Sequence, residues 1–530
     1  MITSLYMFCA GIIAALAIPH AGVPGILLDI SPFSFIFYVL GLAVLYRALT
    51  RIPSRIFARP ALYTYCWFMG FFTFSLSWVA NALLIDGNPY AWAYPFALFG
   101  LPLLLSLYPA IVIGALFRFL SANHTRTITP MIMVLGIGVA EYARAHMLTG
   151  FPWNMPSYVW SETTPIFQSL SAIGPYALSI LTLCWALSII LAITAGPEIR
   201  RHWGFQTFSI ISFIAVLLYG QITLNESQKS PTRNKDTPVI QVVMVQANVP
   251  QSEKWDSNKI GDHFYKHIQL SLPQGPIQNV KTLVVWPETA LPPELTESPV
   301  AKREIKKMLS HYPSGSVLIT GAIRADFRAP RPTFYNSLLI YDQTGQTIQS
   351  YDKHHLVPFG EYMPFQDIIP FGPLAKFEGL QSGPKPEPLA LQNSISITPL
   401  ICYEVIFPGE VRRISTTSAP ILVNITNDSW YGNSAGPYQH LAQARARAIE
   451  NGQSMIRVAG TGVSATINPW GQIQNKITYN VQKSNISTLW LYSMKYNIYK
   501  KYGDSAFFIL GIGLFLLILR NYITKKRYKL

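Results

Sequence analysis

Eight long apolar runs constrain this chain more than any other feature of its sequence. They lie at about 4–18, 31–49, 61–85, 91–119, 130–147, 173–195, 204–223 and 505–522. Most approach or exceed the roughly 20 residues that an α-helix needs to cross about 30 Å of hydrocarbon. Half of the 530 residues are apolar and only 13% are charged, a balance typical of proteins that fold in a bilayer. We therefore expect a multi-pass α-helical membrane bundle with about eight spans.

The first apolar run could instead be a secretion signal, since Ala15-Leu16-Ala17 resembles a small-residue cleavage site. No Lys or Arg precedes this run, however, and further apolar runs follow at once. A retained first span is the expected outcome.

The basic residues predict how the spans are oriented. They gather in alternate loops and in the tail, at 47–59, 118–126, 200–202 and 525–529. The loops at 86–89 and 148–166 contain no Lys or Arg. By the positive-inside rule, both termini face the cytoplasm, and the long segment between the seventh and eighth runs faces the periplasm of a bacterium. This distribution explains the net charge of +15 without nucleic-acid binding, which would cluster basic residues on a soluble domain.

The segment at 239–490 has the pattern of a layered α/β domain. Eight short β-rich stretches lie at 240–246, 282–286, 317–321, 337–341, 394–402, 421–425, 455–459 and 463–467. Helical stretches lie between several of them, at 257–272, 301–310 and 435–451. Strands that alternate with helices indicate sheets covered by helices. The chain thus divides into a bundle of seven spans, a polar linker, this domain, and a return segment with the eighth span and a basic tail, at 1–224, 225–238, 239–490 and 491–530.

One of the four cysteines, Cys402, lies in the α/β domain, and the other three lie in apolar runs. Cys402 ends the β-rich stretch at 394–402 and is followed by Tyr403 and Glu404. A thiol at a strand end can act as a nucleophile if its neighbours turn it into a thiolate. Taken alone, a buried structural cysteine is the simpler interpretation.

Two further strand ends carry polar groups that could act with this thiol. Trp286-Pro287-Glu288-Thr289 places a carboxylate directly after a buried strand. Glu288 is therefore either a general base or a helix-start residue bound to backbone amides. Lys353 lies in the stretch at 351–361, where a fixed cation could stabilise an oxyanion. A Cys, a Glu and a Lys at strand ends of one domain form a set able to perform acyl transfer.

His354 and His355 follow this lysine and raise the question of a metal site. Adjacent residues point to different faces, and no second pair of ligands with the spacing of a zinc site lies nearby. We therefore expect neither a metal nor an organic cofactor.

Three sequence blocks resemble the catalytic blocks of the nitrilase superfamily, which uses a Glu-Lys-Cys triad on an α-β-β-α sandwich: WPET, YDKHHLVPFGEYMPF and ICYEVIFP. The likeness covers about 239–490. The stretches at 245–251, 254–255 and 149–153 are similar to further signatures of one membrane family, the apolipoprotein N-acyltransferases. A nitrilase-like domain between a seventh and an eighth span also resembles that family.

The resemblance implies a role for each matching residue. Glu288 would be the general base, Lys353 the oxyanion stabiliser and Cys402 the nucleophile. The residues implied to support these three, or to contact substrate, are Glu361, Tyr403, Glu404, Trp255, Asn336 and Pro364. Trp255 would belong to a mobile loop over the cleft.

The resemblance also implies a two-step acyl transfer. Cys402 would take the sn-1 acyl chain of a phospholipid, with phosphatidylethanolamine as the expected donor, and hold it as a thioester. The α-amine of the diacylglyceryl-cysteine at the N-terminus of an apolipoprotein would then accept the chain, in the last step of bacterial lipoprotein maturation. The expected protein is a monomer in the bacterial inner membrane, with its catalytic domain in the periplasm.

Two other functions compete with this one. A membrane-anchored carbon-nitrogen hydrolase would keep the triad and use water as the acceptor. It would gain nothing from eight spans, whereas an enzyme acting on two lipid-anchored substrates meets them in the bilayer. A transporter predicts polar residues in mid-span, and these are sparse.

Two features allow more than one interpretation. Glu141 and Arg144 lie three residues apart near the outer end of the fifth run. They form either a functional intramembrane pair or a structural pair at a helix end. The side chains that form either a lipid-facing rim or ordinary core are Trp255, Phe359, Tyr362, Met363 and Phe365.

Overall fold

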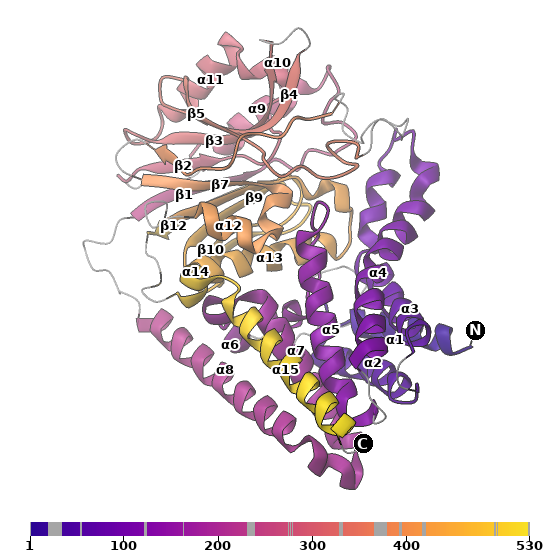
Figure 1. Ribbon diagram of the computed structural model, residues 1–530. Helices are drawn as coiled ribbons and strands as arrows, with labels where there is room; N and C mark the ends of the chain where they lie inside the picture. Colours follow the sequence, from indigo (N-terminus) through magenta and orange to yellow (C-terminus); the bar gives the residue numbers. More distant parts are fainter. Residues whose placement is uncertain are drawn as a thin grey trace.

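The computed structural model divides the chain into a bundle of helices and a β-sandwich that caps one end of the bundle (Figure 1). It describes residues 2–19, 34–53, 56–120, 125–162, 164–229, 239–273, 275, 277, 279–327, 332–364, 379–391, 395–415, 420–491, 494 and 497–527. The bundle takes the N-terminal part of the chain and the last helix, and the sandwich takes the segment between them.

Each of the eight apolar runs forms a helix. These are α1 (Ile2–Ala15), α2 (Ser34–Leu49), α3 (Ala58–Ser75) with the 3-10 helix η1 (Ser77–Leu84), α4 (Tyr94–Leu120), α5 (Thr125–His146), α7 (Leu170–Thr194), α8 (Trp203–Lys229) and α15 (Ser505–Arg527). Among the described residues, α4, α5, α7, α8 and α15 are long and apolar enough to cross a membrane, and α3 with η1 makes a sixth span if this pair, bent by 47°, counts as one. The helices α1 and α2 are shorter. The multi-pass bundle is confirmed, and the number of eight spans stays a prediction.

Helix α8 continues through Lys229, so 225–229, expected to begin a polar linker, are helical. Polar residues at the end of a helix that leaves the apolar layer keep their backbone hydrogen bonds within the helix, and their side chains need no core. The rest of the expected linker, 230–238, lies outside the described residues.

The sandwich is built from two six-stranded sheets. Their strands are β1 (Val239–Gln246), β2 (Thr282–Val285), β3 (Val317–Asp326), β4 (Thr333–Tyr341), β5 (Thr347–Asp352) and β12 (Lys483–Trp490) in the first sheet, and β6 (Leu389–Leu391), β7 (Ile395–Ile401), β8 (Ile421–Thr426), β9 (Ser454–Ala459), β10 (Ser464–Ile467) and β11 (Ile473–Ile477) in the second. The orders are β12-β1-β2-β3-β4-β5 and β11-β10-β9-β8-β7-β6. Strands β1, β2 and β3 are parallel, as are β7, β8 and β9.

The eight strands predicted from sequence are all present, and the four that were missed are the four sheet edges: β5, β6, β11 and β12. An edge strand has a neighbour on one side only and is more exposed, so its sequence lacks the continuous apolar run of a central parallel strand. In β5 the side chains of Thr347, Gln349 and Ser350 are exposed, whereas every residue of β8 is buried.

Helices cover both outer faces of the sandwich. The helices α9 (Ile260–Ser271) and α11 (Pro299–Leu309) pack on the first sheet. The helices α12 (Pro408–Ile414) and α13 (Gly436–Asn451) lie between the second sheet and the bundle, and their buried side chains belong to one core with those of α5 and α7 (Figure 1). The sheets, with an apolar layer between them, complete the expected α-β-β-α sandwich. The second sheet is therefore the one held against the membrane-spanning part.

Candidate active site

Glu288, Lys353 and Cys402 each lie just past the carboxyl end of a strand. Glu288 follows β2, Lys353 directly follows β5, and Cys402 directly follows β7 as the first residue of the 3-10 helix η5 (Cys402–Ile406). Their exposed fractions are 5%, 1% and 7%. The Nζ atom of Lys353 is 3.7 Å from Oε1 of Glu288, and the Cys402 thiol lies close enough to interact electrostatically with both charges. The structure thus brings the three together between the two sheets.

The backbone at Cys402, and at the residue next to Glu288, adopts a conformation that residues other than glycine rarely take. Cys402 has a φ of 50°, and Thr289, next to Glu288, has a φ of 51°. Such left-handed residues are held only where the surrounding structure demands it, and they cluster at functional sites. Gly321 makes room for the turn at Glu288, because a Cβ there would lie 2.5 Å from the Cα of Glu288.

Lys353 is held by a second carboxylate, that of Glu361. Its Nζ atom lies 2.9 Å from both oxygens of Glu361. Asn336 on β4 bridges the two acids by donating to Glu288 Oε1 at 2.7 Å and to Glu361 Oε1 at 2.9 Å. Burial alone would lower the pKa of Lys353, but the charges of Glu361 and Glu288 raise it above its ordinary value. Lys353 is therefore a buried, fixed cation beside Glu288.

The Cys402 thiol is protonated at neutral pH in this environment. Burial, and then the charge of Glu288, raise its pKa to about 12, and Lys353 opposes them only in part. A thiol of this kind needs a base that removes its proton as it attacks. Among the carboxylates around it, Glu288 has the largest electrostatic effect on this thiol.

Glu404 joins the strand ends that carry Lys353 and Cys402. One of its oxygens accepts the backbone N–H of Ile401 at 2.8 Å. The other accepts the N–H of His354 at 2.9 Å and the hydroxyl of Tyr351 at 2.5 Å. Burial raises the pKa of Glu404 despite these donors. The residues before Cys402 and around Lys353 are thereby tied to one side chain.

Tyr403 links the segment that carries Cys402 to the bundle. Its hydroxyl donates to the carbonyl oxygen of Gly150, in the turn that follows α5, at 3.1 Å. In the same turn, the carbonyl of Thr149 lies 2.9 Å from Nε2 of His355. Gly150 has a φ of 72°, and a Cβ there would lie 2.4 Å from the Ala145 carbonyl oxygen, so only glycine fits this turn.

The Glu141–Arg144 pair supports the same turn. Arg144 on α5 is hydrogen bonded both to Glu141 and to the carbonyl oxygen of Phe151. Its guanidinium also lies over the ring of Phe72, 5.3 Å from the centroid. These contacts favour the structural interpretation of this buried pair, which holds the end of α5 against the turn.

A charged cluster behind Cys402 was not found by sequence reasoning. His440 on α13 has its Nε2 atom 3.2 Å from the Cys402 carbonyl oxygen and its Nδ1 atom 3.0 Å from Asp428. Arg457 on β9 donates to Asp428 at 2.7 Å. Burial alone would raise the pKa of Asp428, but Arg457 and His440 lower it to about 2. An available signal was the arginine inside the largely apolar strand β9.

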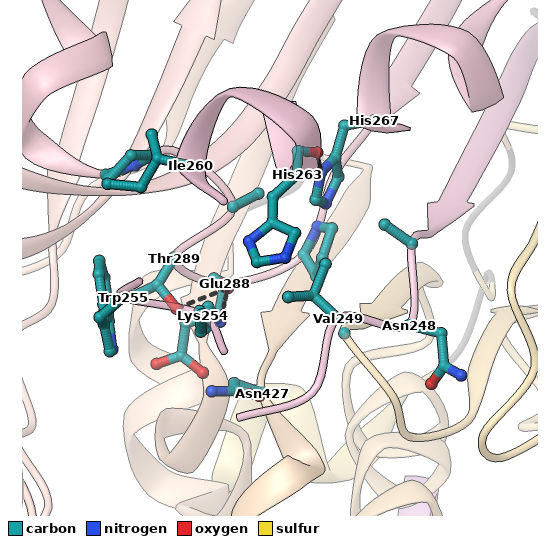
Figure 2. Close-up of a pocket in the computed structure, with 15 residues that line it drawn as sticks. Asn248, Val249, Lys254, Trp255, Ile260, His263, His267, Glu288, Thr289 and Asn427 are labelled. Carbon is teal, nitrogen blue, oxygen red and sulfur yellow. Dashed lines mark hydrogen bonds between the residues drawn. The ribbon is translucent and has the colours of Figure 1, made fainter. Parts of the chain in front are cut away.

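The remaining predicted residues lie around the cleft rather than in it. Trp255 lines a pocket next to Glu288, shown in Figure 2, and packs with Tyr362 against a small cluster that contains Leu356. Pro364 lies in a turn after Glu361, partly buried, with no contact that defines a role. Phe365, one of the expected rim residues, lies outside the described residues.

The two adjacent histidines contact protein groups. His354 Nδ1 lies 2.9 Å from the Gly383 carbonyl oxygen, and His355 Nδ1 lies 3.1 Å from Glu410. Among the residues that the structure describes, no group of three or more His, Cys, Asp or Glu side chains is arranged to hold a metal ion.

Comparison with known proteins identifies both parts of the chain. Residues 241–488 match the carbon-nitrogen hydrolase family, and residues 10–188 match the apolipoprotein N-acyltransferase N-terminal domain. An apolipoprotein N-acyltransferase from Rhodopseudomonas palustris is 37% identical over 78% of this chain and 78% of its own length. One from Bradyrhizobium diazoefficiens is 36% identical over 87% of this chain and 86% of its own.

This chain belongs to the apolipoprotein N-acyltransferase family. Among solved structures, a nitrilase superfamily protein from Saccharomyces cerevisiae is similar to this chain, with 18% sequence identity and a TM-score of 0.35. The alignment covers 48% of this chain and 90% of the yeast chain. The family membership confirms that the nitrilase-like sandwich and the apolar helices belong to one acyltransferase.

Proposed function

We propose that this membrane acyltransferase moves the sn-1 acyl chain of a phospholipid to the α-amine of a diacylglyceryl-cysteine at an apolipoprotein N-terminus. Its relatives are named for N-acylation of apolipoproteins. One observation carries the proposal furthest: Tyr403, next to the nucleophile, donates to Gly150, four residues past the last residue of α5. A thiol beside the end of a candidate span can meet substrates that stay anchored in lipid.

Exposed apolar side chains near this contact support a lipid substrate. Leu148, two residues before Gly150, is 89% exposed, and Phe359, two residues before Glu361, is 52% exposed. Both have positive φ values, 57° and 62°, which are unfavourable for bulky side chains. Exposed apolar groups held in strained backbone beside a polar cleft fit the edge of a bilayer better than they fit water.

In the first half-reaction, Glu288 takes the thiol proton of Cys402 while the sulfur attacks the sn-1 ester carbonyl. The oxyanion that forms is stabilised by the Lys353 ammonium, which needs no rearrangement because Glu361 and Glu288 already hold it. When the intermediate collapses, the C–O bond breaks, and the lysophospholipid leaves with the proton from Glu288. The acyl chain remains on Cys402 as a thioester.

In the second half-reaction, the acceptor amine attacks the thioester carbonyl and Glu288 takes a proton from the nitrogen. The C–S bond breaks, the sulfur recovers the proton, and an amide is formed. Phosphatidylethanolamine is the donor that the family resemblance suggests. In this proposal a single chain performs the reaction in the inner membrane, with the sandwich in the periplasm and both termini in the cytoplasm.

Intact mass of the purified protein tests the mechanism. After incubation with phosphatidylethanolamine vesicles, wild type should gain one hydroxylamine-labile acyl group, and Cys402→Ser should gain none. Addition of a diacylated lipopeptide should release the label as an N-acyl peptide. Release as free fatty acid would favour the competing carbon-nitrogen hydrolase, and full transfer by Cys402→Ser would exclude the thioester.

A further inference from the structure

A pocket beside Glu288 has no role in the chemistry described above. It encloses about 480 Å³, part of it open to solvent, at the ends of β1, β2, β8 and β9 and under α9 (Figure 2). The backbone of Glu288 forms one wall, so a group bound here would lie next to the proposed base.

Three polar atoms of the pocket lining are buried without a hydrogen-bond partner: Asn248 Oδ1, His263 Nδ1 and Asn427 Oδ1. The amide nitrogens of both asparagines are engaged, with Asn480 at 3.2 Å and with Gln251 at 2.8 Å, which fixes the direction of the oxygens. Figure 2 shows the His263 ring in the same pocket. Buried polar atoms are satisfied by protein groups, ordered water or a ligand, and two amide oxygens with a ring nitrogen in one pocket suit a ligand that supplies hydrogen-bond donors.

Lys254 adds a donor to this set of acceptors. Its Nζ atom donates to the carbonyl oxygen of Glu288 at 3.1 Å, and two further N–H groups remain on the nitrogen when it is charged. Burial lowers the pKa of Lys254 to about 8. A phosphodiester would meet the two asparagine oxygens unfavourably, because its anion offers acceptors alone. A peptide backbone offers both N–H and C=O groups and suits the mixed lining.

The position of the pocket favours the same ligand. Helix α9 covers the first sheet, whereas the second sheet and its helices face the bundle (Figure 1). The pocket itself lies next to Glu288, where the ends of strands from both sheets meet α9. The acyl chains of the acceptor stay in lipid, and its peptide has to lead away from the bilayer.

We propose that this pocket binds the backbone of the residues that directly follow the lipidated cysteine of the acceptor. The inference rests on the proposed function and adds to it a peptide subsite, formed by Asn248, Lys254, His263 and Asn427. Bound there, the peptide would orient the acceptor amine toward the thioester on Cys402. Because the contacts are to backbone groups, the subsite would accept apolipoproteins of different sequence.

Gly460 offers a way to fill the pocket without disturbing the fold. A Cβ at this position would lie 3.5 Å from Asn427 Oδ1, an ordinary contact, and the glycine has no positive φ. Gly460→Val should therefore place methyl groups beside the unpaired oxygen. His263→Phe removes a second polar group from a different element. Tyr265→Phe, on the same helix but outside the pocket lining, is the matched control.

The test uses the full-length protein loaded with a thioester from phosphatidylethanolamine. Single-turnover transfer is measured to two acceptors at equal, subsaturating concentration: S-diacylglyceryl-cysteine amide, and the same group followed by four residues. In wild type and in Tyr265→Phe, the longer acceptor should react about tenfold faster, the factor that corresponds to one or two backbone hydrogen bonds. In Gly460→Val and in His263→Phe, this advantage should fall below about twofold.

An equal rate for both acceptors in wild type would overturn the inference, as would a length advantage that persists in both pocket variants. Slower thioester formation in the pocket variants, with an unchanged length advantage, would assign the pocket to the phospholipid donor and also overturn it. Thioester formation in each variant shows that the protein is folded. Failure of the proposed function itself would appear separately, as a wild-type protein that takes no acyl group from phospholipid.

Discussion

The Nε2 atom of His440 lies 3.2 Å from the carbonyl oxygen of Cys402. Cys402 has a left-handed backbone, and His440 is fully buried, with its Nδ1 atom 3.1 Å from Arg457, which donates to it. A strained residue keeps its conformation only if its neighbours fix it. His440 is thus a positioning residue, which aims the thiol by holding the peptide group of the nucleophile.

Replacement of His440 tests this role. His440→Leu removes the hydrogen bond to the Cys402 carbonyl, and we expect thioester formation to slow by about tenfold to a hundredfold, the effect of about 1.4–2.8 kcal/mol. His440→Gln can donate to the same oxygen and should recover most of the rate. Stopped-flow release of lysophospholipid measures both. His311→Ala, at an exposed site, is the control. A folded Leu variant with the wild-type rate, or no recovery with Gln, would contradict the assignment.

Glu288→Gln should make the thiol more reactive toward a small electrophile while it stops acyl transfer. The charge of Glu288 raises the pKa of Cys402, so its removal lowers that pKa and increases the thiolate fraction at any pH below about 12. We expect alkylation of Cys402 by iodoacetamide at pH 9 to be about tenfold faster than in wild type. Peptide mass spectrometry measures the rate of alkylation. Acyl transfer should fall by about 10²–10⁴-fold, because the base is gone.

The control for this substitution is Glu297→Gln, which removes an exposed carboxylate and should change neither rate. Equal losses of alkylation and acyl transfer in Glu288→Gln would mean that Glu288 holds the fold of the cleft rather than the proton.

Lys353→Met should destabilise the protein, and a second substitution should restore part of the loss. Without Lys353, the carboxylates of Glu288 and Glu361 stay buried without their cation, which costs about 3–5 kcal/mol. Lys353→Met with Glu361→Gln removes one of those charges and should unfold at a higher temperature than the single variant. Thermal unfolding in detergent measures the unfolding temperatures of wild type and of both variants. Both variants should be inactive, since the oxyanion has no cation, and a double variant no more stable than Lys353→Met would contradict the buried-charge argument.

The turn after α5 should be sensitive to a single methyl group. Gly150→Ala places a Cβ 2.4 Å from the Ala145 carbonyl oxygen and forces the turn to move away from Tyr403. Tyr403→Phe removes only the hydroxyl, so its loss of stability should be about 0.5–1.5 kcal/mol. We expect the Ala variant to lose more activity than the Phe variant. Hydrogen exchange across 143–153 should increase in Gly150→Ala. Gly87→Ala, in an open loop with no atom near the added Cβ, controls for strain at a positive φ.

Much of the fold follows from local pattern. Each central strand is a short apolar run, and Glu288 and Cys402 were found at the ends of two such runs, whereas Lys353 was found through the resemblance of its sequence block to a known family. The same reasoning missed the edge strands, because exposed polar residues interrupt the apolar pattern of β5 and β11. It also left Glu141 and Arg144 with two interpretations, since their contact with Phe151 depends on how a loop turns back on its helix.

By itself, the sequence determined that this chain folds in a membrane, that an α/β domain interrupts its spans, and which three groups could perform acyl transfer. These conclusions rest on hydrophobic periodicity, on residue chemistry and on the resemblance of short sequence blocks to a known family, all of which are local. Only the tertiary structure decided that His440 holds the nucleophile, that Tyr403 joins it to Gly150, and that unpaired polar atoms surround a pocket beside Glu288. Those contacts join residues far apart in the chain, and packing of the sheets and helices, rather than any short sequence pattern, brings their atoms within hydrogen-bonding distance.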